Sequence, residues 1–194
     1  MTNLPTEIKE RFYRALKGDI PIETFEKWLY ADRTLEQYLK PEDYLDLIAL
    51  GFKKSDAKYE LWKLLKKHID VADFETYKLL SLLQEARLKT KRLPYVLVEF
   101  YELYCDGYYF LQDLAIGYGL AIQVPQMENT AETWDELTTA QKATLLESLE
   151  PGLDDELTRV ADWLESGKIK LTGEIDERGH YGYVDLRIGS ANVS

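Results

Sequence analysis

Apolar residues recur at helical spacing through the first half of the chain, in stretches separated by prolines and glycines. Pro5, Pro21 and Pro41 each stand at the start of such a stretch, whereas Gly18 and Gly51 follow the end of one. Proline is favoured in the first turn of a helix, and glycine is favoured just beyond the last turn. The pattern therefore predicts a series of short amphipathic helices.

Two further helix starts are predicted from side chains that can cap a helix. Thr34 is followed three residues later by Gln37, the spacing of a capping box. Asp70 precedes a long apolar-periodic segment and can accept hydrogen bonds from the first backbone N–H groups of that segment. We expect a helix to begin just after Thr34 and another just after Asp70.

In residues 95–104 apolar side chains occupy almost every position, and Glu99 and Glu102 interrupt the run. A helix that is apolar nearly all round is covered by its neighbours. We therefore expect this segment to be the central helix of the fold. Large side chains on the apolar sides of the predicted helices form the expected core, which includes Trp28, Trp62, Phe100, Leu103 and Tyr104.

The C-terminal part of the chain contains the signals for β-structure. Residues 169–175 and 181–186 alternate apolar and polar side chains around a turn at 176–179, which indicates a β-hairpin. Residues 120–124 have the apolar composition of a third short strand, which Pro125 would end. The predicted fold class is mainly α, a multi-helix bundle with a small C-terminal antiparallel β-hairpin or three-stranded sheet.

Two helices that are rich in acidic residues are predicted between Trp134 and Lys168, with Pro151 and Gly152 separating them. Their leucines and Val160 make the apolar faces. The acidic side chains fall on the predicted outer faces and comprise Asp135, Glu136, Glu147, Glu150, Asp154, Asp155, Glu156, Asp162 and Glu165.

Charge is distributed unevenly along the sequence. Residues 1–92 contain 18 basic and 16 acidic side chains, whereas residues 93–194 contain 6 basic and 19 acidic ones. We predict a single domain, residues 1–194, with a helical part at 1–92 and an acidic part at 93–194. A field of one sign repels phosphate and attracts basic partners. Direct binding of nucleic acid is therefore not expected.

The composition favours a reducing cytoplasmic environment. Cys105 is the single cysteine, so an internal disulfide is not possible. The first residues mix acids, bases and a proline, unlike a signal peptide. No apolar run reaches the length of a membrane span. We expect a cytoplasmic protein that does not contact a membrane.

Residues that could support catalysis are few. His68 and His180 are the two histidines, and neither they nor Cys105 stand in a known nucleophile or metal-binding motif. Gly117 and Gly119 lack the further residues of a nucleotide-binding loop, so we expect a simple turn there. The sequence predicts no catalytic residue, no metal and no cofactor. Asp106 and Asp113 lie within a tyrosine-rich stretch at 101–118 and are the carboxyl groups from which an alternative enzyme site could be built.

The segment ALKGDIPIETFEKWLY, residues 15–30, resembles the opening of bacterial colicin-type immunity proteins. Gly18 and Ile20 match the short break that follows the first helix of that family, and Phe25 matches a phenylalanine in the first turn of the second helix. The resemblance covers about a tenth of the chain. It implies a helical protein that binds a toxin tightly and without catalysis.

Charge and resemblance together suggest a non-catalytic cytoplasmic binding protein, an immunity protein that neutralises a basic toxin such as a nuclease. A small enzyme that uses Asp and Tyr near residues 101–120 is one alternative, and an acidic structural or regulatory adaptor is another. The tyrosines at 101–118 suit either a core or an interface. The predicted partner-binding residues are Trp134, Asp135, Glu136, Asp154, Asp155, Glu156 and Asp162.

Overall fold

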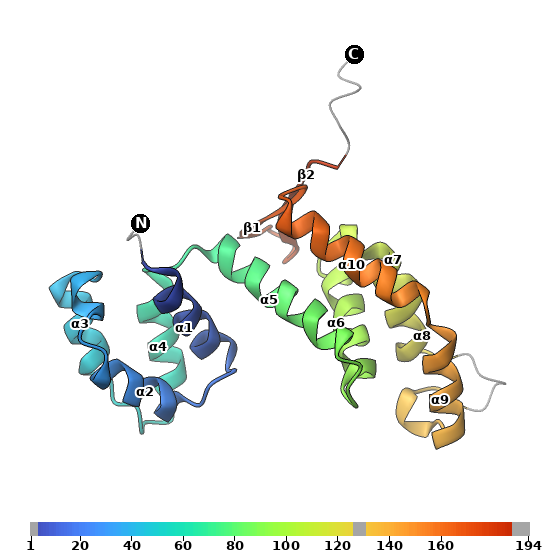
Figure 1. Cartoon of the computed structure of the whole chain (residues 1–194), viewed down its shortest axis with the longest axis horizontal. Coiled ribbons are helices and arrows are strands. Elements are labelled where there is room, and N and C mark those ends of the chain that lie inside the picture. The colour runs from blue at the N-terminus through green and yellow to red at the C-terminus, as the bar shows by residue number, and fades with distance from the viewer. Residues whose placement is uncertain (1–3, 126–130, 188–194) are drawn as a thin grey trace, which may run out of the picture. The chain divides into compact units, whose positions relative to one another are not determined.

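The computed structural model describes residues 4–125 and 131–187 of the chain (Figure 1). The chain divides into two compact units, Met1–Tyr77 and Lys78–Ser194, with the boundary inside α5 (Val71–Arg87). Charge alone placed the division of the chain at Arg92, and the prediction of a single domain stays a prediction. In the described ranges the structure is mainly helical with one two-stranded antiparallel sheet, which confirms the fold class. No helix in these ranges is long and apolar enough to cross a bilayer.

The first unit is built from short helices around an aromatic and aliphatic core. Before α5 its elements are α1 (Thr6–Lys17), α2 (Ile22–Ala31), η1 (Leu35–Gln37), α3 (Pro41–Ile48) and α4 (Ala57–Lys66). α1 contacts α2 and α4, and α3 contacts α4. Phe12 and Phe25 are fully buried with ring centroids 6.1 Å apart, and Trp28 lies at the edge of the same cluster. The helix starts predicted from Pro5, Pro21 and Pro41 and the end predicted at Gly18 are confirmed, whereas α3 ends at Ile48, before Gly51.

The cap predicted at Thr34 is wrong, whereas the cap predicted at Asp70 is confirmed. Thr34 makes no capping bond to the short 3-10 turn η1. Asp32, two residues earlier, accepts hydrogen bonds from the backbone N–H groups of Thr34 and Leu35 instead. Asp70 accepts hydrogen bonds from the backbone of the first turn of α5. Among the described residues, Thr138 and Gln141 form a capping box in the second unit, at the start of α9 (Thr139–Ser148).

The second unit is organised around α6 (Leu93–Cys105), which contacts the helical turns that residues 109–123 form (Figure 1). Val96, Leu97 and Phe100 of α6 are fully buried, while Tyr95 is exposed, so neighbours cover most of the helix but not all of it. The other helical elements of this unit after α5 are η2 (Tyr109–Leu111), α7 (Gln112–Leu114), η3 (Ala115–Gly119), α8 (Leu120–Gln123), η4 (Trp134–Glu136), α9 (Thr139–Ser148) and α10 (Gly152–Glu165).

The predicted strand at residues 120–124 is wrong, because this segment is the helix α8. It continues a series of helical turns that includes the π-helical turn η3. Gly119 permits the close packing of η3 on α6, since a Cβ at this position would stand 2.4 Å from the backbone oxygen of Leu97. A short apolar run does not by itself distinguish a strand from a buried helix. Contact with α6 stabilises this segment as a helix. In the described ranges the sheet therefore has two strands rather than three.

The predicted β-hairpin is confirmed as β1 (Ile169–Ile175) paired with β2 (Tyr181–Asp185). Ile169 and Leu171 are buried and belong to the same core as α6 and α10. Asp176 holds the turn, because its Oδ1 accepts hydrogen bonds of 2.8 Å from the backbone N–H groups of Arg178 and His180. The hairpin therefore closes one side of the second unit's core.

The expected core residues have three different outcomes. Phe100 is fully buried, as predicted. Trp28, Leu103 and Tyr104 are half-buried and pack against the two cores. Trp62 is 40% exposed, so its prediction is wrong. The indole of Trp62 lies beside the ammonium group of Lys66, 4.6 Å from the ring centroid, an arrangement that suits a solvent-facing aromatic side chain.

Candidate functional site

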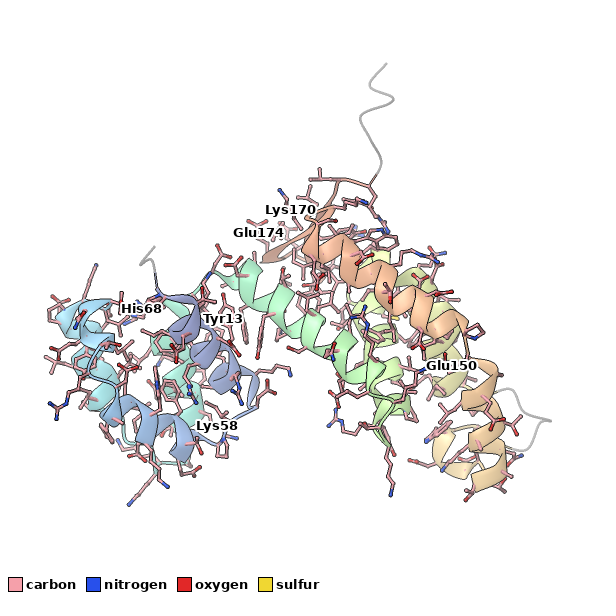
Figure 2. All side chains as sticks on the ribbon, viewed as in Figure 1. Tyr13, Lys58, His68, Glu150, Lys170 and Glu174 are labelled. Carbon is pink, nitrogen blue, oxygen red and sulfur yellow. The ribbon has the colours of Figure 1, made fainter. Side chains whose placement is uncertain are left out.

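An open groove of about 630 Å³ lies in the second unit between the α7–η3 segment and the start of α10. Asp113 and Tyr118 come from the first segment, and Glu156 and Arg159 come from α10. Glu150, in the turn before α10 (Figure 2), also lines the groove. Three carboxylates and one guanidinium group therefore face a single hollow, which gives the groove an acidic character.

Glu156 is a buried carboxylate, which sequence reasoning misplaced on an exposed face. Only 4% of the residue is exposed, because it lies on the same side of α10 as Leu153 and Val160. The spacing of three and four residues from these apolar positions is the signal that could have identified it. Burial raises the pKa of the Glu156 carboxyl above its usual value, and the charge of Asp113 adds to this effect.

Arg159 connects the two sides of the groove. Its Nη1 lies 2.8 Å from Oε2 of Glu156 and 3.6 Å from Oδ2 of Asp113. The guanidinium charge lowers the pKa of Glu156 but does not outweigh burial. About half of the Arg159 side chain is exposed, so solvent screens its charge. The buried carboxylate thus has a partner that remains accessible from the groove.

Tyr118 reaches the start of α10 because residue 152 is glycine. A Cβ at Gly152 would stand 2.7 Å from the Tyr118 hydroxyl. Burial raises the pKa of Tyr118, and the negative charge of Glu156 raises it further. The phenol therefore stays protonated at neutral pH and presents a hydrogen-bond donor beside the buried carboxyl group.

A ridge of exposed acids runs along α10 next to the groove. We define the acidic ridge as Asp154, Asp155, Asp162 and Glu165, all of which are exposed. Asp154 forms an ion pair with Lys89, which also forms one with Glu150. In the described part of the chain, the other three ridge carboxylates have no ion pair. They remain available to a basic partner.

The predicted partner-binding residues fall into two groups in the second unit. Asp154, Asp155, Glu156 and Asp162 lie on α10, and of these Glu156 lies beneath the surface. The remaining three belong to η4 and comprise Trp134, Asp135 and Glu136. Whether either group contacts a partner stays a prediction.

The η4 group borders a separate hollow of about 330 Å³ that Trp134 and Asp135 line together with Tyr95. Trp134 is half-buried against the core, and Lys142 Nζ lies 5.4 Å from its ring centroid. Glu136 accepts hydrogen bonds from Glu132 N and Thr133 Oγ1, which lower the pKa of Glu136. Part of this group is therefore committed to local structure.

The tyrosine-rich stretch contributes to both core and surface. Tyr108 is buried, whereas Tyr109 is 50% exposed and packs edge-on against Tyr104. Tyr109 also approaches the ring of His180 at 6.3 Å. Tyr118 reaches the groove, while Cys105 is exposed. The cluster as a whole is therefore neither a single pocket nor a single core.

The two histidines lie in different units. His68 is buried in the first unit (Figure 2), and its Nε2 lies 3.5 Å from Oδ2 of Asp43. Burial lowers the pKa of His68, so the imidazole is neutral at physiological pH. His180 belongs to the hairpin turn, where its Nδ1 lies 3.6 Å from Asp176. Neither histidine lines the groove.

The division into units changes the charge balance that the sequence indicated. Met1–Tyr77 contains 13 basic and 15 acidic side chains, and Lys78–Ser194 contains 11 basic and 20 acidic ones. The second unit therefore still carries most of the negative charge, with a net −9 against −2. The difference in net charge between the two units is smaller than the difference between residues 1–92 and 93–194, because the basic residues of 78–92 belong to the second unit.

A scan against models of known protein families found no match, and searches of curated proteins and of solved structures found none. The segment that resembles colicin-type immunity proteins forms the end of α1, a short break and α2. Ile20 and Phe25 are buried there. The resemblance itself stays a prediction.

The raised pKa of Glu156 predicts a pH-dependent effect of the isosteric change Glu156→Gln. A group with a raised folded-state pKa stabilises the fold most when pH lies below its unfolded pKa, and this contribution is lost as pH rises through the folded-state pKa. Glutamine does not titrate. The variant should therefore gain free energy of unfolding relative to the wild type as pH rises from about 4.5 to 7.

Urea denaturation across this pH range measures the difference between the two proteins. Glu165→Gln on the same helix is the matched control, since Glu165 is exposed. The control should show little change in stability at any of these pH values. A Glu156→Gln variant that loses stability relative to the wild type as pH rises would show that the ion pair with Arg159 outweighs burial.

Proposed function

We propose that the chain is a non-catalytic binding protein whose second unit binds a basic protein through the acidic face of α10. One observation carries this proposal: Asp155, Asp162 and Glu165 are exposed on one helix, and within the described residues they have no ion pair. Exposed charges of one sign accelerate association with a partner of opposite charge and orient it on approach. The groove beside the ridge adds a concave surface of the same sign.

A toxin that acts on nucleic acid is the basic partner we propose. Such an enzyme carries positive charge to hold phosphate, and an acidic inhibitor can cover that charge. The segment at 15–30 supports this assignment through its resemblance to immunity proteins. A cytoplasmic location fits the proposal, because the inhibitor must be present where the nucleic acid is and the exposed Cys105 suits a reducing compartment.

A second candidate function is enzymatic, and a specific observation favours it. Glu156, with its raised pKa, lines the same groove as Asp113 and Tyr118. Buried carboxyl groups of this kind serve as general acids in enzymes. The groove is open, however, and Arg159 already pairs with the carboxylate. An adaptor without a specific acidic interface is the remaining alternative.

Affinity capture from the native cell tests the proposed binding face and separates a toxin inhibitor from an adaptor. The ridge variant Asp155→Asn/Asp162→Asn/Glu165→Gln removes three unpaired charges and leaves the Lys89 ion pairs in place. The control variant Glu23→Gln/Glu36→Gln/Asp46→Asn removes three exposed charges from the first unit. Exposed charges contribute little to stability, so both variants should fold.

We expect the wild type and the control to retain one basic protein and the ridge variant to retain much less of it. Co-expression of that protein should be toxic, and the wild-type chain should remove the toxicity. Equal capture by the ridge variant and the control would contradict the proposed face. A captured protein that is not toxic would favour the adaptor.

A further inference from the structure

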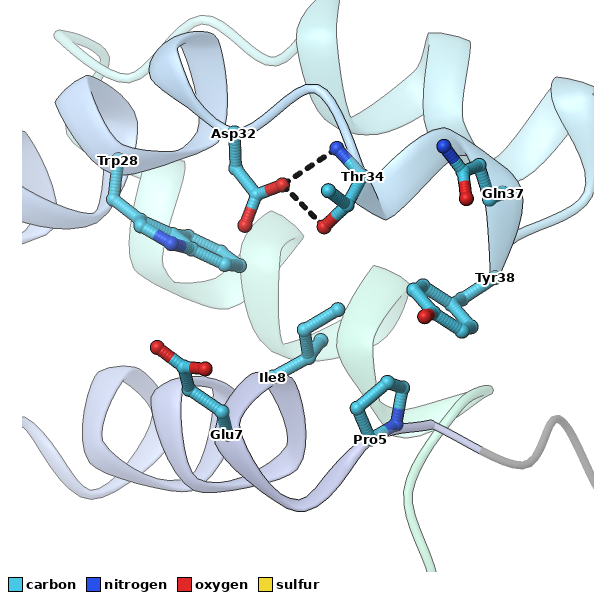
Figure 3. Close-up of a pocket in the computed structure, with 8 residues that line it drawn as sticks. All are labelled: Pro5, Glu7, Ile8, Trp28, Asp32, Thr34, Gln37 and Tyr38. Carbon is cyan, nitrogen blue, oxygen red and sulfur yellow. Dashed lines mark hydrogen bonds between the residues drawn. The ribbon is translucent and has the colours of Figure 1, made fainter.

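A cavity of about 220 Å³ lies in the first unit, at the start of α1, the end of α2 and the segment around η1 (Figure 3). Trp28 and Tyr38 stand on opposite sides of it, with Ile8 between them. Its volume is about a third of that of the groove beside α10. It suits a small ligand rather than a peptide.

Asp32 places a carboxylate at this cavity in a fixed orientation. Its Oδ1 accepts hydrogen bonds of 2.7 Å from the backbone N–H and the hydroxyl of Thr34, and another of 3.2 Å from the N–H of Leu35. Burial raises the pKa of Asp32, but these hydrogen bonds outweigh burial and keep the pKa below its usual value. The second oxygen makes no hydrogen bond within the described residues and is directed toward Trp28 in Figure 3.

A second carboxylate, that of Glu7, approaches from α1 on the other side of the Trp28 ring (Figure 3). Glu7 has no ion pair in the part of the chain that the structure describes. Two carboxylates therefore border one cavity that Trp28 and Tyr38 also line, and within the described residues neither carboxylate has an ion pair. Negative charge of this kind is stabilised when a cation enters.

Trp28 already attracts a cation in the folded chain. The guanidinium carbon of Arg11 lies 5.5 Å from the centroid of the Trp28 ring, although Arg11 does not line the cavity. Aromatic rings bind cations through the negative potential of their faces, and tryptophan does so best. Rings combined with carboxylates form the surroundings that an organic ammonium ion requires.

We propose that this cavity binds a small organic ammonium ion, with Trp28 and Tyr38 contacting its methyl or methylene groups and Asp32 and Glu7 balancing its charge. The apolar side chain of Ile8 also lines the cavity, between Trp28 and Tyr38, and offers a contact to the carbon-bearing part of such a cation. This site lies in the first unit and is independent of the function proposed for the acidic ridge.

Choline serves as the probe. Its neutral isostere 3,3-dimethylbutan-1-ol, called dimethylbutanol below, has carbon in place of the nitrogen. Both are titrated into the full ¹⁵N-labelled chain while the indole N–H signal of Trp28 is followed, identified by its absence in Trp28→Phe. Choline should shift this signal in a saturable manner. Dimethylbutanol at the same concentrations should bind at least about fivefold more weakly, as expected for a loss of about 1 kcal/mol.

Asp32→Asn tests the charge without removing the turn, because the amide oxygen of asparagine can accept the bonds from Thr34 and Leu35. This variant and Glu7→Gln should each raise the dissociation constant of choline about fivefold or more. Glu10→Gln, an exposed change on α1 outside the cavity, should leave it unchanged. Equal binding of choline and dimethylbutanol, or no saturable shift with choline, would overturn the proposal.

Discussion

Replacing Phe100 with alanine is expected to lower the free energy of unfolding of the second unit by about 3 to 5 kcal/mol. The ring is fully buried at the centre of α6, where it belongs to the core shared with α10 and the hairpin. Alanine would remove most of the buried apolar surface at this site and leave a cavity. The surrounding helices are anchored on several sides, so they can fill little of this space.

Chemical denaturation of the full chain, followed by far-UV circular dichroism, measures this loss. Tyr95→Ala provides the matched control on the same helix, because Tyr95 is 52% exposed. Tyr95→Ala should lower the free energy of unfolding much less than Phe100→Ala does. An unaltered unfolding midpoint for Phe100→Ala would show that α6 is not the centre of the unit.

The change Gly119→Ala should also destabilise the second unit, by about 1 to 3 kcal/mol, the range of an overpacked core. The new Cβ would stand 2.4 Å from the backbone oxygen of Leu97 and 2.9 Å from Cβ of Tyr101. Neither atom belongs to the flexible end of a side chain. Accommodation therefore requires η3 to move away from α6.

Gly117→Ala is the control for this prediction, because residues 117 and 119 lie in the same π-helical turn. A Cβ at Gly117 would meet nothing within 4 Å. The change should therefore be neutral or stabilising by up to about 1 kcal/mol, through a smaller loss of backbone entropy on folding. Similar losses of stability for both variants would contradict the close packing of η3 on α6.

Local sequence signals predicted most of the helices and the hairpin. They failed where contacts between segments distant in sequence determine the secondary structure or the burial of a side chain. Proline positions located the starts of α1, α2 and α3, apolar spacing and the cap at Asp70 located α4 and α5, and alternation located the hairpin. Residues 120–124 have an apolar run that fits strand or helix equally well, and packing on α6 makes it helical. Trp62 directly follows Leu61, which is buried together with Leu65, but the Trp62 side chain is exposed. Helical periodicity does not show reliably which of two adjacent apolar residues faces the core.

The candidate sites were predictable to a smaller extent. Consecutive acids marked the ridge on α10, because charge density is visible without a structure. The groove was not predictable, since it brings Asp113 and Tyr118 to Glu156 through the packing of η3 and α7 near α10. The cavity at Trp28 likewise depends on residues from three separate elements. No spacing along the chain indicates such a combination.

The association rate of the captured basic protein across a salt series tests the central claim most directly, namely that the acidic ridge attracts the partner. Ionic strength is varied from about 0.05 to 0.5 M, which shortens the screening length severalfold. The rates of the wild type and of the first-unit control Glu23→Gln/Glu36→Gln/Asp46→Asn should fall steeply with salt. The ridge variant Asp155→Asn/Asp162→Asn/Glu165→Gln should associate more slowly at low salt and show a flatter dependence. A ridge variant with the same rates and the same salt dependence as the wild type would contradict the account.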